Sequence, residues 1–252
     1  MSGDYLNKLR ALSGSRSFRV PAILVWSAGG FLLAQVLVSV GLSALFEAGV
    51  PFNQLGKVVL TFVISLAMYA AALLIVVGIP TYIHRWSWSD VRKRLGIVGR
   101  PQGVHGVAAI FGFAVYIGIS WALLWAATQG LSWFDISQKQ ALGFDSFETW
   151  PEVIVGFLAF VILAPIAEEL FFRGFLFGRL RRLLPFWAAA LLTSMLFGLA
   201  HGQLNVGIDT FALSLVLCFL YEGSGAIWSS IVLHMLKNGV AFALLFQMSS
   251  LQ

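Results

Sequence analysis

The sequence has few charged residues. Only 11% of its 252 residues are Asp, Glu, Lys or Arg, whereas 59% are hydrophobic. A soluble domain carries about 25% charged residues, because its surface must face water. A single cysteine, Cys218, allows no internal disulfide bond. These shortages exclude an ordinary soluble domain and a disulfide-linked scaffold, and they predict an all-α fold, a polytopic transmembrane helical bundle.

Long apolar runs predict seven membrane spans within one membrane domain, residues 1–252. A helix needs about 20 apolar residues to cross a bilayer. The predicted spans are Val20–Phe46, Lys57–Ile83, Val104–Gln129, Pro151 to the arginines at 179–182, Pro185–Gly202, Gly207–Tyr221 and Ala226–Met248. Ser89–Leu95 is predicted to form a short helix at the membrane interface.

The basic residues are distributed unevenly along the chain. Twelve of the 16 lie before the first span or in the loops after the second and fourth spans: Lys8, Arg10, Arg16, Arg19, Arg85, Arg92, Lys93, Arg94, Arg100, Arg179, Arg181 and Arg182. This is the positive-inside pattern, which places the N-terminus in the cytoplasm of a multi-pass protein of the cell membrane. Because the pattern explains the positive charge as a topology signal, a nucleic-acid partner is not expected.

Ionisable side chains within the predicted spans are the first candidates for chemistry. Each costs about 2.5–3.5 kcal/mol at the centre of a span. The segment AEELFFRG contains Glu168, Glu169 and Arg173. Glu169 and Arg173 are four residues apart, so they share a helix face and can form an ion pair. Glu168 is displaced by about 100°, and is therefore predicted to remain available for catalysis.

Two further motifs present polar groups at helical spacing. FGLAH places Phe197 and His201 on one face, and HMLKN does the same for His234 and Asn238. Phe197 is interpreted as a packing residue. We expect Glu168, His201, His234 and Asn238 to meet in a common interior within the membrane, so that residues 151–248 form the catalytic helices.

These four side chains are suited to hydrolysis of a carbonyl group. Glu168 with His201 can take a proton from water, and His234 with Asn238 can donate hydrogen bonds to an oxyanion. Glu168, His201 and His234 also resemble a zinc site with two histidines and a carboxylate. The sequence leaves metal-bound water and glutamate-activated water both open, and it indicates no serine or cysteine nucleophile.

Two other classes of function remain as alternatives. The polar cluster could serve packing in a non-catalytic immunity or scaffold protein, in which Glu169 and Arg173 are only a structural ion pair. A proton-coupled transporter could use Glu168 as a carrier, but internal repeats are absent. Lys237 sits near the middle of its predicted span and has no partner that the sequence identifies.

The three motifs together resemble those of a known family. EELFFR (168–173), FGLAH (197–201) and HMLKN (234–238) look like the EExxxR, FxxxH and HxxxN motifs of the CPBP family, also called the CAAX protease or Abi family, of intramembrane endopeptidases. The resemblance covers about Pro151–Met248. It implies that Glu168 and His201 activate water and that His234 and Asn238 form the oxyanion hole, with Glu169 and Arg173 in support.

The resemblance also implies a type of substrate. Eukaryotic members of the family cleave prenylated C-terminal motifs, and bacterial relatives are linked to bacteriocin maturation and self-immunity. We therefore expect a membrane-associated peptide or protein as the partner, whether lipidated or not. The family is often described with eight helices, so the expected number of spans is seven or eight.

Overall fold

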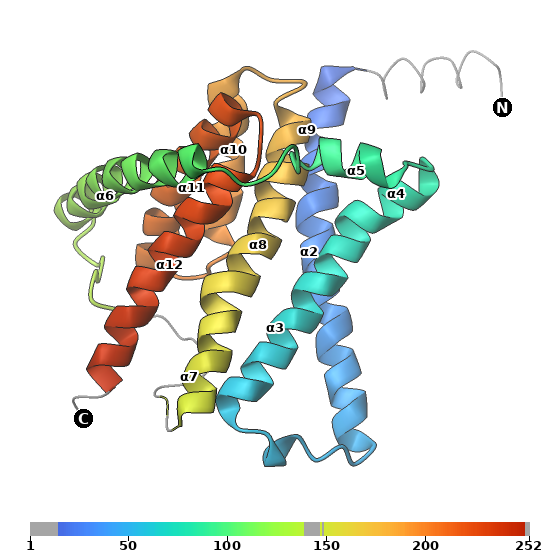
Figure 1. Ribbon diagram of the computed structural model, residues 1–252, viewed down its shortest axis with the longest axis vertical. Coiled ribbons are helices and arrows are strands. Elements are labelled where there is room, and N and C mark those ends of the chain that lie inside the picture. The colour runs from blue at the N-terminus through green and yellow to red at the C-terminus, as the bar shows by residue number, and fades with distance from the viewer. Residues whose placement is uncertain (1–14, 139–146, 148, 250–252) are drawn as a thin grey trace.

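The computed structural model describes residues 15–138, 147 and 149–249, and every regular element in these ranges is a helix (Figure 1). This part of the chain forms eight helical rods and a 3-10 turn, Phe52–Gln54 (η1). The rods are Arg16–Glu47 (α2), Lys57–Ile83 (α3, η2 and α4), Trp88–Arg94 (α5), Gly103–Gly130 (α6), Trp150–Leu180 (α7, η3, α8, η4 and α9), Phe186–Leu199 (α10), Leu204–Ser224 (α11) and Trp228–Ser249 (α12). The all-α prediction is confirmed for these residues. Lys8 and Arg10, which contributed to the predicted orientation, lie outside them.

The predicted number of spans is confirmed only in part. Each of the seven apolar runs is helical over most of its length, but five of the described helices are long and apolar enough to cross a membrane. These five are Arg16–Glu47, Lys57–Ile83, Gly103–Gly130, Trp150–Leu180 and Leu204–Ser224. With 14 residues, α10 is shorter than the roughly 20 that a span requires. The chain is thus a multi-span membrane protein.

Two groups of helices flank the long helix Trp150–Leu180. On one side, α2 pairs with α3, and both contact the long helix. On the other side, α11 packs against α6, α10 and α12. Figure 1 shows this arrangement, with the start of α2 and the end of α12 at opposite ends of the molecule. The long helix therefore meets both groups, and it carries the acidic motif between them.

Close contact between α10 and α11 depends on glycine. A methyl group added at Gly198 would lie 2.6 Å from the carbonyl oxygen of Gly207 on α11. Small residues allow membrane helices to approach in this way. The contact fixes the end of α10, from which His201 follows two residues later.

Local signals in the sequence explain where several helices begin. The Ser87 hydroxyl accepts a hydrogen bond from the backbone N–H of Asp90, whose carboxylate accepts one from the Ser87 N–H, so that α5 starts with a capping box. The long helix begins with Pro151 in its first turn. These starts agree with the predicted interfacial helix and with the predicted start of the fourth span.

Candidate active site

The winding of the long helix changes on both sides of the acidic residues. Segments η3 (Leu158–Leu163) and η4 (Leu170–Phe177) are π-helical, and α8 (Ala164–Glu169) lies between them. Short π-helical turns occur often at functional sites. Pro165 has no N–H and cannot donate to the carbonyl five residues earlier. That carbonyl, of Phe160, accepts a hydrogen bond from the Asn238 amide at 2.9 Å.

The predicted ion pair between Glu169 and Arg173 is present. An Arg173 Nη1 atom lies 2.9 Å from Glu169 Oε1, and both side chains are fully buried. The Arg173 guanidinium also lies over the ring of Phe197, 4.7 Å from its centre. Because a buried charge needs a compensating partner, the pair stabilises both ions beside the site.

His234 connects this ion pair to Glu168. Its Nδ1 atom lies 2.9 Å from Glu169 Oε1, and its Nε2 atom lies 3.7 Å from Glu168 Oε2. A carboxylate paired with Arg173 can only accept a hydrogen bond, so Nδ1 carries the proton and donates it. In the neutral ring, Nε2 then keeps a lone pair that faces Glu168.

Glu168 is the accessible carboxylate of the two. Its side chain is 15% exposed, whereas that of Glu169 is 0% exposed. Glu168 Oε1 accepts a hydrogen bond of 2.6 Å from the Tyr69 hydroxyl on α3. Tyr69 was not among the site residues predicted from the sequence. Its position in the sequence could have indicated a functional role, because Tyr69 lies in the middle of a span and tyrosine usually lies at the membrane interfaces.

His201 lies in the turn after α10 and points into the site from a third direction. Its Nδ1 atom is 2.8 Å from the carbonyl oxygen of Phe197, which can only accept, so Nδ1 carries the proton. The other ring nitrogen, Nε2, is left for the cavity. Phe197 is fully buried and contacts the rings of both His201 and His234, which agrees with its predicted packing role.

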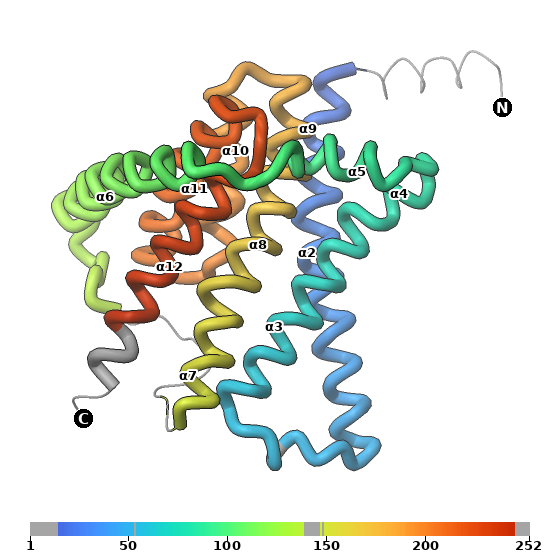
Figure 2. Tube along the Cα trace, viewed as in Figure 1, coloured from blue at the N-terminus to red at the C-terminus, as the bar shows by residue number. Residues whose placement is uncertain are grey.

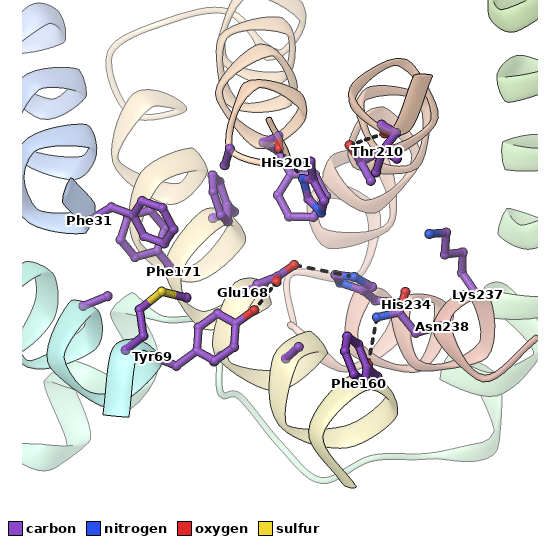
Figure 3. Close-up of a pocket in the computed structure, with 18 of the residues that line it drawn as sticks. Phe31, Tyr69, Phe160, Glu168, Phe171, His201, Thr210, His234, Lys237 and Asn238 are labelled. Carbon is purple, nitrogen blue, oxygen red and sulfur yellow. Dashed lines mark hydrogen bonds and ion pairs between the residues drawn. The ribbon is translucent and has the colours of Figure 1, made fainter. Parts of the chain in front are cut away.

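The four predicted catalytic side chains line one cavity of about 310 Å³ (Figure 3). Most of its wall is apolar, with Phe31, Phe160 and Phe171 among the aromatic contributors. Tyr69 and Lys237 add further polar groups. Glu168 is 12 residues from the Leu180 end of the long helix, or about 18 Å. The cavity therefore lies well inside the span.

The contacts within the cavity differ from the expected pairing. Glu168 was expected to act with His201, but in the described part of the chain His234 is the histidine in contact with Glu168. Asn238, expected to act beside His234, uses one amide hydrogen on Phe160 and retains a second. Contacts between side chains on different helices depend on how those helices are placed relative to one another. The spacing of residues within one helix does not predict them.

Metal coordination was left open by the sequence. The Nε2 atoms of His201 and His234 and the Glu168 carboxylate are chemically suitable zinc ligands. The hydrogen bond from His234 to Glu169 is the kind that orients a metal-binding histidine. Among the residues that the structure describes, however, no three His, Cys, Asp or Glu side chains are close enough together to hold a metal ion. His201 would have to approach the other two.

Lys237 has a partner that the sequence did not reveal. Its ammonium group lies 3.5 Å from Asp209 Oδ2 on α11. The other Asp209 oxygen accepts hydrogen bonds from Tyr116 and Ser120 on α6, at 2.7 and 2.5 Å. Asp209 therefore links α6, α11 and α12 beside the cavity.

The chain is 35% identical over 77 residues to "Putative membrane peptidase YdiL" of Bacillus subtilis (strain 168), covering 31% of this chain and 32% of that protein. It is 31% identical over 99 residues to "Membrane-embedded CAAX protease MroQ" of Staphylococcus aureus (strain USA300), covering 36% and 39%. An "Uncharacterized 24.3 kDa protein" of Escherichia coli is 31% identical over 131 residues, covering 47% and 60%.

Each of these relatives is matched over less than two thirds of its own length. No solved structure matches the chain significantly. Residues 150–240 match the family described as type II CAAX prenyl endopeptidase Rce1-like. This segment, which contains the acidic motif and both histidines of the cavity, is therefore similar to the Rce1-like type II CAAX prenyl endopeptidases.

Proposed function

We propose that this protein is an intramembrane endopeptidase that hydrolyses a peptide bond in a membrane-associated or lipidated protein. The observation that carries the proposal is the convergence of Glu168, His201, His234 and Asn238 on one largely apolar cavity. Ionisable groups are costly inside a membrane and usually mark a functional path or site. Two similar proteins, named "Putative membrane peptidase YdiL" and "Membrane-embedded CAAX protease MroQ", support the same reaction.

Each polar group has a role in this proposal. Glu168 takes a proton from water as the water oxygen attacks the substrate carbonyl carbon, and His201, whose Nε2 atom is available, holds that water in place. Glu168 then returns the proton to the leaving amine as the C–N bond breaks. The second amide hydrogen of Asn238 donates to the developing oxyanion. His234 donates to it through Nε2 only when the ring is doubly protonated, because its Nδ1 proton is already used by Glu169.

With a metal ion in the site, the attacking water would be activated by the metal, but the same residues would form the site. Glu168, His201 and His234 would hold zinc, which lowers the pKa of a bound water. In both versions Glu169 and Arg173 orient His234. The cavity and the motifs form part of a single membrane domain in this proposal, with a peptide or protein as substrate.

The direct test uses purified full-length protein in detergent. Membrane-anchored peptides with and without a C-terminal prenyl group are incubated with wild type, His201→Ala and the control His105→Ala, and the products are identified by mass spectrometry. We expect cleavage by wild type and the control, and loss of cleavage by His201→Ala. Inhibition by a chelator, reversed by zinc, would select the metal version.

Equal product from His201→Ala and wild type, with all variants folded, would refute this catalytic assignment. Absence of cleavage by wild type, together with a substrate-dependent proton flux in vesicles, would favour a transporter. Absence of both activities would favour the immunity or scaffold alternative.

Tyr69 is expected to act as a positioning residue for Glu168. A hydrogen bond to a charged group contributes about 1.5–3 kcal/mol, so Tyr69→Phe should reduce kcat about 10- to 150-fold with little change in KM. Tyr82→Phe, at a phenol that is 86% exposed at the end of the same helical rod, is the control. Equal kcat values for Tyr69→Phe and wild type would remove Tyr69 from the mechanism.

A further inference from the structure

Three arginines from separate parts of the chain converge at the end of the molecule where α9 (Gly178–Leu180) ends. Arg94 comes from the last turn of α5, Arg179 from α9, and Arg182 from the turn that follows. All three line one small cleft with Trp86. Arg94 and Arg179 are partly buried and Arg182 is exposed. Figure 2 traces the connector from α5 to α6 across this end of the bundle.

Close backbone contacts fix this cluster, which we call the arginine site. A methyl group at Gly174 would lie 2.9 Å from the carbonyl oxygen of Leu95, so glycine lets the end of α5 rest directly on the long helix. The backbone N–H of Ile227 donates to the Gly96 carbonyl at 2.9 Å. Arg94 is therefore held beside Arg179 by the fold rather than by a flexible loop.

Aromatic rings, rather than carboxylates, support the two inner guanidinium groups. Arg94 lies over the Trp86 ring at 4.1 Å and Arg179 lies 5.3 Å from the same ring centre. Arg179 also lies 4.2 Å from the centre of Phe175. Cation–π contacts orient a guanidinium but leave its net positive charge uncompensated.

The ion pairs found in the described part of the chain include none of the three arginines. Asp90 on α5 accepts hydrogen bonds from Ser87, which lower its pKa, and the charge of Arg94 lowers it further, but no ion pair joins Asp90 to Arg94. Glu222, at the end of α11, is paired with Arg181. Arg94 and Arg182 lie close enough to repel Arg179. Three positive charges held together in this way form a site that can bind an anion.

The arginine site lies at the level where a span meets the headgroups. Leu180 ends the fourth candidate span, and Ile83 ends the second. Tyr82, Trp88 and Trp187 near these ends are 86%, 71% and 65% exposed, as expected of aromatic residues at a membrane interface. An anion at this level that also meets apolar surface is most simply a phospholipid headgroup.

We propose that Trp86, Arg94, Arg179 and Arg182 bind the phosphate of an anionic phospholipid. The cleft between them has room for about one oxygen-sized group at 20 Å³. One phosphate oxygen enters it between Arg94 and Arg179, and Arg182 contacts the remaining oxygens from the exposed side. The bound lipid offsets the repulsion between the arginines and holds α5 against the long helix. This inference does not depend on the proposed protease activity.

The test is lipid binding by the full-length protein in detergent, followed by native mass spectrometry and thermal unfolding. The probes are short-chain phosphatidylglycerol, phosphatidylcholine and inorganic phosphate, at about 0.15 M salt, where charges more than about 8 Å apart are screened. Wild type is expected to bind phosphatidylglycerol more tightly than phosphatidylcholine, and its unfolding temperature is expected to rise with phosphatidylglycerol. Each arginine removed should weaken binding about fivefold.

Two variants test the arginine site. The double variant Arg94→Gln/Arg179→Gln removes the two partly buried charges. The single variant Arg182→Gln removes the exposed charge at little risk to folding. The matched control is Arg92→Gln/Arg100→Gln, which removes two exposed arginines nearby in sequence and should bind as wild type does. Equal weakening in the control, or equal binding of phosphatidylcholine, would show diffuse attraction and overturn the proposal. Inorganic phosphate binding as tightly as phosphatidylglycerol would overturn the assignment to lipid.

Discussion

Replacing Glu168 by Gln is expected to lower the rate of peptide cleavage about 10²–10⁴-fold, the range that a general base contributes. The amide keeps the shape of the carboxylate and can still accept the hydrogen bond from Tyr69, which is 2.6 Å long in the wild-type protein. It cannot take a proton from water. The measurement is kcat/KM on the peptide that wild type cleaves, with the unfolding temperature recorded for each variant.

Glu222→Gln is the matched control for this prediction. It makes the same chemical change at a carboxylate that is 37% exposed and remote from the cavity. Its cleavage rate should equal that of wild type. Cleavage by folded Glu168→Gln at the wild-type rate would contradict the role of Glu168 and would return the acidic motif to a structural function.

The second large effect concerns stability. Arg173→Gln is expected to lower the free energy of unfolding by about 3–5 kcal/mol, since it leaves the carboxylate of Glu169 without its charged partner in a fully buried position. Glu169 also accepts the hydrogen bond from His234 at 2.9 Å, so the same substitution should reduce cleavage by the remaining folded protein. Unfolding in detergent, followed by heat or denaturant, measures the stability change.

Arg181→Gln provides the comparison, because it breaks an arginine–glutamate pair of similar length whose side chains are 39% and 37% exposed. An exposed pair contributes about 0–1 kcal/mol. A stability loss in Arg173→Gln no larger than that in Arg181→Gln would mean that Glu169 finds compensation elsewhere. The buried pair would then not be required for folding.

Much of the fold could be predicted because hydrophobicity alone determines where membrane helices lie. Lys57–Ile83 was predicted with the bounds that are observed, and Ser89–Leu95 is shifted by one residue. Errors arose where a helix end depends on local backbone geometry. The helix predicted to reach Gly202 ends at Leu199, and Gly202 itself has a φ of 71°. The helix α10 therefore ends at 14 residues, too short to cross a membrane, although the sequence predicted a longer helix there.

The site was predictable where two residues share one helix. Glu169 and Arg173 pair at the predicted spacing of four residues. Contacts between helices were not predictable in this way, since Tyr69 and Glu168 are 99 positions apart and Lys237 and Asp209 lie on different helices. In each pair, one residue (Tyr69 or Asp209) belongs to no motif that the sequence indicated. Only the positions of the helices relative to one another reveal them.

Two hydrogen bonds join α12 to the long helix from residues four positions apart. His234 contacts Glu169, and Asn238 contacts the Phe160 carbonyl. Both side chains lie on one face of α12, so a rotation of α12 by one residue position, about 100°, would break both bonds together. The histidine and the amide therefore cannot be repositioned independently by turning the helix. This half of the cavity therefore depends on a single orientation of α12.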